Sequence, residues 1–146
     1  MHWKRVHPTV DPNRFRSRLR SMNDAFDDAL VTGWEPLTAG IHLPDPKDAH
    51  VVAAALVGRA DVIVTQNTKD FPDRVLKPLG LDVVRVDEFL LDQFDLSPAS
   101  ACRIVNEQAA AMKRPPVSTG QLLDRLARSG APIFARRVEM EFEREA

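Results

Sequence analysis

The sequence predicts an α/β fold in which a parallel sheet is flanked by helices and followed by a purely helical C-terminal region. Two short β-branched runs, 61–65 and 82–86, have the continuous apolar pattern of buried parallel strands. A helical pattern over 70–79 lies between them, which gives the strand, helix, strand order of a parallel sheet. Beyond Val86 the sequence contains only helical segments separated by turn signals.

The N-terminal part predicts one long amphipathic helix from Pro12 to Leu30. Asp11 can cap its free amides, and proline at the first helical position loses no hydrogen bond. Apolar residues recur at helical spacing and predict a buried stripe, while arginines spread over the remaining surface. The stripe consists of Phe15, Leu19, Met22 and Phe26. A short strand is predicted over 31–34, and a loop over 36–46.

The central and C-terminal helices follow from caps and breakers. Asp45 or Asp48 can cap an alanine-rich helix that runs from Ala49 to Leu56 and stops at Gly58. Turn signals rich in proline then separate the later helices, of which the last two are expected to form a hairpin that packs on the sheet or extends from it. The predicted ranges are 87–94, 98–112, 118–128 and 132–144.

Composition narrows the classes of function. The chain has 146 residues, is 44% hydrophobic and carries a formal net charge of −1, so any nucleic-acid binding must come from local patches. It has one cysteine, Cys102, which fits a reducing compartment. No stretch approaches the roughly 18 apolar residues of a membrane span. The expectation is a cytoplasmic protein without membrane contact.

The segment from Asp45 to Phe71 contains the strongest functional signal, because two acidic clusters flank one apolar run. Asp70 follows the first predicted strand, on the edge where open α/β sheets bind ligands. Thr65, Asn67 and Asp70 offer oxygen atoms, which Mg²⁺ or Mn²⁺ prefers, and Asp48 could face the same point. Two carboxylates and a metal ion can activate water and stabilise charge at a scissile phosphate.

Structural explanations compete with this hypothesis. Acidic residues before a helix are commonly caps, and asparagine or aspartate after a strand commonly bonds local backbone. His50 is interpreted as a packed or surface histidine, Arg14 to Arg20 as a solvated face, and Cys102 as an inert buried thiol. A phosphatase or nucleotide-binding domain is a further alternative, which the lack of a glycine-rich phosphate loop disfavours.

The order and spacing of these clusters resemble a known family. Residues 45–55 followed by 61–72 resemble the C-terminal half of PIN-domain ribonucleases of the VapC toxin type, and the similarity extends over about 11–94. The resemblance implies a PIN-like fold and a Mg²⁺- or Mn²⁺-dependent endoribonuclease of a toxin-antitoxin system. Such proteins are often dimeric and are often held inactive by a cognate antitoxin.

The resemblance also implies roles for single residues. Asp48 and Asp70 would be catalytic, and both would bind metal together with Asn67. Asp45 and Thr65 are accessory candidates. Candidates for RNA contact are Arg14, Arg18 and Lys69.

One part of the family pattern is not found. A PIN domain opens with an apolar strand ending in Asp, followed by helices that carry a Glu, and Met1 to Val10 contains no such run. We therefore expect a partial PIN-like domain over 1–95, lacking the first strand, and a C-terminal helical extension over 96–146. We expect a partner polypeptide, such as an N-terminal PIN fragment, to supply the missing acidic residues. A cognate antitoxin and a homodimer are further expected partners. The alternative is a non-catalytic PIN-like module that binds another protein.

Overall fold

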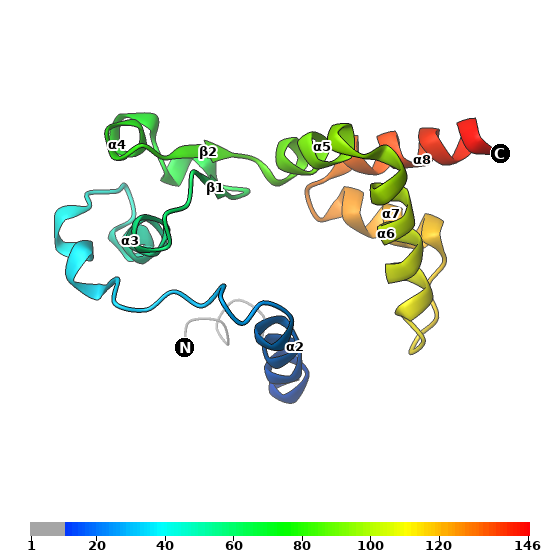
Figure 1. Ribbon diagram of the computed structural model, residues 1–146, viewed down its shortest axis with the longest axis horizontal. Helices are drawn as coiled ribbons and strands as arrows, with labels where there is room; N and C mark the ends of the chain where they lie inside the picture. Colours follow the sequence, from blue (N-terminus) through cyan, green and yellow to red (C-terminus); the bar gives the residue numbers. More distant parts are fainter. Residues whose placement is uncertain (1–10) are drawn as a thin grey trace.

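The computed structural model describes residues 11–146, which are mostly helical and contain one small sheet (Figure 1). Strands β1 (Val62–Val64) and β2 (Asp82–Val84) pair in parallel, with Ile63 opposite Val83. These are the only two strands in this part of the chain. The predicted α/β class and the parallel pairing are confirmed.

The connection between the strands is less helical than predicted. It contains the 3₁₀ turn η3 (Thr68–Asp70), helix α4 (Asp73–Leu76) and the 3₁₀ turn η4 (Lys77–Leu79). The single helix expected over 70–79 does not form, because Pro72 has an extended backbone conformation and Pro78 lacks an amide hydrogen. The connection ends at Gly80, whose left-handed φ of 73° favours glycine.

Helix α3 (Ala49–Val57) packs beside β1 and ends at Gly58, as predicted. Its Val52 and Ala53 are fully buried, and Leu76 of α4 is fully buried in the same cluster. We call this cluster the sheet core. Its buried members are Ile41, Leu43, Ala49, Val52, Ala53, Ile63, Phe71, Leu76 and Leu81.

The segment before α3 has no strand at residues 31–34, so that prediction was wrong. Gly33 has a positive φ of 77°, which turns the chain away from the extended conformation. Two 3₁₀ helices follow, η1 (Glu35–Gly40) and η2 (Pro46–Asp48), within the segment expected to be a loop.

Helix α2 (Pro12–Ala25) begins as predicted but has an exposed apolar face. The carboxylate of Asp11 accepts a hydrogen bond from the amide of Asn13 at 3.0 Å, and the helix ends five residues before Leu30. Met22 is 55% and Phe26 63% exposed, and α2 has no buried residue. The expected buried stripe was wrong, because periodicity identifies an apolar face without identifying what covers it. In Figure 1 α2 stands apart from the sheet.

The C-terminal region forms a second core from four helices, which confirms the predicted helical extension. Ser118 and Gln121 form a capping box before the third of these helices, and Ser97 caps the second. The rings of Phe94 and Phe134 meet edge to face, with centroids 6.5 Å apart. The helices are α5 (Val86–Leu96), α6 (Pro98–Ala111), α7 (Thr119–Arg128) and α8 (Pro132–Glu145). The predicted hairpin corresponds to α7 and α8, which pack together.

Long-range hydrogen bonds connect α5 to α8 within this helical core, and one further bond joins the core to the sheet unit. The carboxylate of Asp87 accepts from the amides of Ile133 and Phe134 at 3.0 and 2.8 Å, and so caps α8 from α5. The side-chain amide of Gln66, which follows β1, donates to the carbonyl of Ser129 at 2.9 Å. The division after residue 95 stays a prediction, and in the structure Phe94 belongs to the helical core.

Two further sequence predictions concern the first ten residues and the possibility of a membrane span. The prediction that Met1 to Val10 lacks an apolar strand ending in a carboxylate lies outside the described residues. Within residues 11–146 no helix is long and apolar enough to cross a membrane.

Candidate functional site

Asp48 lies at the N-terminal end of α3, beside the carboxyl end of β1. Helix α3 packs against β1, and Gly58 at its far end lies four residues before the strand, so the helix runs back along it. The side chain of Asp48 makes no capping hydrogen bond. Asp45 has that role instead, since its carboxylate accepts from the amide of Lys47 at 3.0 Å. The cap interpretation therefore holds for Asp45 and not for Asp48.

Asp70 lies on a tight loop that directly follows β1. The amide of Thr65 donates to the carbonyl of Val84 on β2 at 3.0 Å. The hydroxyl of Thr65 then accepts from the amide of Asn67 at 3.1 Å, and the carbonyl of Asn67 accepts from the amide of Asp70 at 3.1 Å. Backbone groups and one hydroxyl thus shape the loop. The side chains of Asn67 and Asp70 form no hydrogen bond with any of residues 11–146.

The two acidic clusters interact electrostatically. Desolvation raises the pKa of Asp48 above its ordinary value, and the negative charges of Asp45 and Asp70 raise it further, while His50 lowers it. Asp48 and Asp70, which belong to separate elements, therefore lie within range of a repulsive electrostatic interaction. We call Asp45, Asp48 and Asp70 the acidic edge.

A hollow of about 370 Å³ adjoins this edge and brings cations beside Asp70. It is lined by Gln66, Asn67, Thr68, Lys69, Asp70 and Arg85. Asp48 is not among the lining residues, so the hollow contains the second cluster alone. Lys69, a candidate for RNA contact, lines the same hollow as Asp70.

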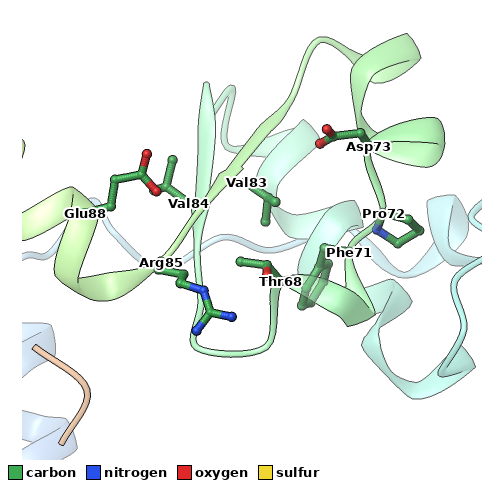
Figure 2. A pocket seen from close by; sticks show the side chains of 8 residues that line it. All are labelled: Thr68, Phe71, Pro72, Asp73, Val83, Val84, Arg85 and Glu88. Carbon is green, nitrogen blue, oxygen red and sulfur yellow. The ribbon is translucent and has the colours of Figure 1, made fainter.

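A second hollow, of about 400 Å³, shares Thr68 and Arg85 with the first and is drawn in Figure 2. The carboxylates of Asp73 and Glu88 lie at opposite sides of this view. Arg85 was not among the candidate residues predicted from the sequence. It directly follows β2, so the rule that ligands bind at the carboxyl ends of parallel strands could have found it.

The donor atoms of the acidic edge suit a hard cation. Carboxylate and amide oxygens are preferred by Mg²⁺ and Mn²⁺, and a bound cation would offset the negative charges of Asp45 and Asp70 that raise the pKa of Asp48. Residues 11–146 contain no group of three or more His, Cys, Asp or Glu side chains that could hold a metal ion. Asp48 and Asp70 thus offer a pair of carboxylates, with Asn67 as a neutral oxygen donor.

The remaining candidates are not members of the acidic edge. His50 is exposed, its Nδ1 is hydrogen-bonded to the carbonyl of Lys47 at 2.6 Å, and its ring lies 5.9 Å from that of Trp34, which agrees with a surface histidine. Burial raises the pKa of the Cys102 thiol, as expected for an inert cysteine. Arg14 and Arg18 extend from α2 into a hollow formed with the C-terminal region.

A parallel sheet with acidic side chains at the carboxyl ends of its strands defines a ligand-binding α/β fold. Residues 5–69 match the family model described as PIN domain, and residues 86–139 match the one described as VapC50 C-terminal domain. The chain therefore belongs to the PIN-domain family, of the VapC type, as its motifs indicated.

A relative from Mycobacterium tuberculosis (strain ATCC 25618 / H37Rv), named "Putative ribonuclease VapC50", is 42% identical over 114 residues. The match covers 78% of this chain and 66% of the relative, so the chain spans just under two thirds of that protein. No solved structure matches the chain significantly. Asp48 and Asn67 lie inside the PIN match, and Asp70 is the residue immediately after it.

Proposed function

We propose that this chain is a metal-dependent endoribonuclease, the toxin of a toxin-antitoxin system, and that the acidic edge is its catalytic centre. The observation that supports this most is the convergence of Asp48 and Asp70 from two separate elements onto one end of the sheet. Membership of the PIN family and the name of the mycobacterial relative support the same assignment.

In this proposal Asp48 and Asp70 hold one Mg²⁺ or Mn²⁺ ion, and Asn67 contributes a neutral oxygen. The ion would supply Lewis-acid stabilisation of the scissile phosphate and a water molecule of lowered pKa. Thr65 positions the loop through its bond to the amide of Asn67. The negative charge of Asp45 raises the pKa of Asp48. Without the cation this repulsion would disfavour the ionised form of Asp48, so the charge of Asp45 favours retention of the cation.

RNA would approach from the side of Lys69 and Arg85. Both cations line the hollow that contains Asp70, so they can bind phosphate groups flanking the scissile bond. Asp70 and the two cations are thus placed for different tasks, since the carboxylate binds the metal ion and the cations bind the substrate.

We further propose that another polypeptide completes the centre. Asp48, Asp70 and Asn67 supply part of the six oxygen ligands of Mg²⁺, and water or acidic residues of a partner would supply the rest. Further acidic residues would come from an N-terminal PIN fragment or a second copy of the chain, while a cognate antitoxin would hold the enzyme inactive. Among these partners, the antitoxin is the one expected from the family to which the chain belongs.

A second candidate function is a non-catalytic PIN-like module that binds another protein. The exposed apolar face of α2 favours it, because Leu19, Met22 and Phe26 would gain by burial against a partner. This function requires no ionised carboxylate at the acidic edge. Exchange of Asp48 and Asp70 for asparagine therefore separates the two candidates.

The decisive experiment measures cleavage of a structured RNA with Mn²⁺ present, for the chain alone and together with the polypeptide encoded directly upstream. We expect cleavage under at least one condition and its loss in both Asp48→Asn and Asp70→Asn. Asp61→Asn is the matched control, since Asp61 precedes β1 and so lies at the opposite end of the same strand. Cleavage that persists in Asp48→Asn and Asp70→Asn would contradict the proposed centre.

A further inference from the structure

Five cationic side chains surround one hollow of about 590 Å³ beside α2 and the turn between α6 and α7. Arg14 and Arg18 come from α2, and the other three come from the C-terminal region. We call this site the basic hollow. Its lining consists of Arg14, Arg18, Ala111, Met112, Lys113, Arg114, Pro115, Val117 and Arg125.

The positive charge of the basic hollow is not neutralised by neighbouring side chains. No carboxylate is among the residues that line it. All five cations are exposed, and within residues 11–146 none of them forms an ion pair. The ion pairs of this part of the chain are Lys77–Asp82, Arg103–Glu107, Arg136–Glu139, Arg137–Asp95 and Arg144–Glu141.

Ordered local structure holds these cations near one another. Arg14 and Arg18 are four residues apart on α2 and therefore share one face of the helix. Lys113 pairs with Pro116 in an isolated bridge, so the turn that carries Lys113 and Arg114 has a defined conformation. Arg125 lies on α7, whose first turn is fixed by a capping box.

We infer that the basic hollow binds the phosphate backbone of an RNA strand. Four of its five cations are arginines, whose planar guanidinium groups bind phosphate through two hydrogen bonds at once. Met112, Pro115 and Val117 add apolar surface against which a ribose or base can pack. This inference rests on the proposed function, and it assigns the C-terminal helices a part in holding the substrate.

RNA suits the basic hollow better than an acidic protein segment does. A nucleic acid presents one charge at each nucleotide along a continuous strand, so several phosphates can meet several cations of one site. The proposed reaction requires an RNA strand to be held while one of its bonds is cleaved, and the acidic edge, with its repelling carboxylates, is unsuited to holding it. An acidic peptide remains an outcome that the experiment below distinguishes.

The test measures binding without cleavage. A short fluorescein-labelled single-stranded RNA is titrated with the full chain in EDTA, and anisotropy is followed at several salt concentrations. The variant K113Q/R114Q/R125Q should bind on the order of 10-fold more weakly at low salt, and the slope of log K against log salt should fall by about 2, or about 0.7 for each cation lost. R14Q/R18Q should show a smaller change of the same kind.

The matched control is R74Q/R103Q/R136Q, which removes the same charge from exposed positions outside the basic hollow. Circular dichroism and thermal unfolding establish that each variant folds. The inference is overturned if the hollow variants keep the affinity and salt slope of the control. It is also overturned if poly-glutamate of equal charge displaces the RNA as effectively as unlabelled RNA does.

RNA binding by the basic hollow and RNA cleavage at the acidic edge can fail independently of each other. If the chain never cleaves RNA with Mn²⁺ but the hollow variants lose binding, the proposed catalysis fails and the basic hollow stands. If the chain cleaves RNA and the hollow variants bind like the control, the basic hollow fails and the catalytic centre stands.

Discussion

The acidic edge and the basic hollow are opposite in charge but alike in construction. In each, side chains of one sign come from elements that are distant in sequence, and in each the described neighbours leave much of that charge unpaired. A net charge of −1 conceals both, since it averages over the whole surface. The comparison teaches that near-neutral composition does not argue against nucleic-acid binding when charges are segregated.

The two regions differ in the task that their chemistry suits. The acidic edge gathers carboxylates whose mutual repulsion a divalent cation relieves, while the basic hollow gathers arginines that suit phosphate. The loop of the acidic edge is tied through Gln66 to Ser129, at the end of the helix that carries Arg125. The acidic edge and the basic hollow are therefore physically connected. Variants that alter one region, or the contact between them, test how far the two regions act separately.

The largest expected effect is on cleavage when the acidic edge is altered. Asp48→Asn or Asp70→Asn should lower the rate of RNA cleavage by more than about 100-fold, since loss of even a supporting residue of a metal site costs up to that factor. RNA binding in EDTA should stay equal or become slightly tighter, because a negative charge is removed. Single-turnover cleavage and anisotropy measure the two effects. Equal losses of cleavage and binding would contradict the separation of tasks.

Gly130→Ala should disturb the contact between Gln66 and the end of α7, which connects the acidic edge to the basic hollow. Gly130 has a φ of 108°, and an added Cβ would lie 1.9 Å from the side-chain nitrogen of Gln66. The variant should lose about 1 to 3 kcal/mol of unfolding free energy in urea. Gly120→Ala is the matched control, since its Cβ meets nothing closer than 4.0 Å and should leave stability equal or higher. Unchanged stability in Gly130→Ala would contradict the close approach of Gln66.

A smaller loss is expected when the cap of α8 is removed. Asp87→Ala deletes the carboxylate that accepts from the amides of Ile133 and Phe134, which should cost about 0.5 to 2 kcal/mol. Asp92→Ala serves as the control, because Asp92 lies on the same helix and is exposed. Urea unfolding measures both, and equal effects would show that Asp87 does not act as a cap.

The smallest effect is a change in the pKa of Asp48 when Asp45 loses its charge. Asp45→Asn should lower the raised pKa of Asp48 toward the ordinary value, and His50→Ala should raise it further. The folded protein takes up this proton at a higher pH than the unfolded chain, so protonation of Asp48 stabilises the fold as pH falls through its pKa. NMR titration of the carboxyl group checks both directions. A higher pKa of Asp48 in the Asp45→Asn variant would contradict the electrostatic interaction within the acidic edge.

Sequence patterns predicted the sheet unit and the C-terminal helices well, because local signals determine both. The β-branched runs and the stop at Gly58 have the expected roles, and the helix expected over 118–128 forms from Thr119 to Arg128. Asp48 and Asp70 were found because the carboxyl ends of parallel strands and the start of the preceding helix meet at one edge. Their electrostatic interaction agrees with that expectation, although their role in metal binding stays a prediction.

The failures concern features that depend on tertiary contacts. The apolar stripe of α2 was expected to be buried, yet no described element covers Met22 or Phe26. Arg85 was missed, although it directly follows β2 and lines the same hollow as Asp70 on the loop after β1. The basic hollow could not be found in one dimension, because Arg14 and Arg125 belong to elements far apart in the chain.

The central claim is that Asp48, Asn67 and Asp70 share one divalent cation, and paramagnetic Mn²⁺ tests it most directly. Mn²⁺ titrated into the ¹⁵N-labelled chain should broaden the amide signals of these three residues first. The selective broadening should be lost in Asp48→Asn and Asp70→Asn and kept in Asp61→Asn. Broadening that begins elsewhere, or that survives loss of both carboxylates, would contradict the claim.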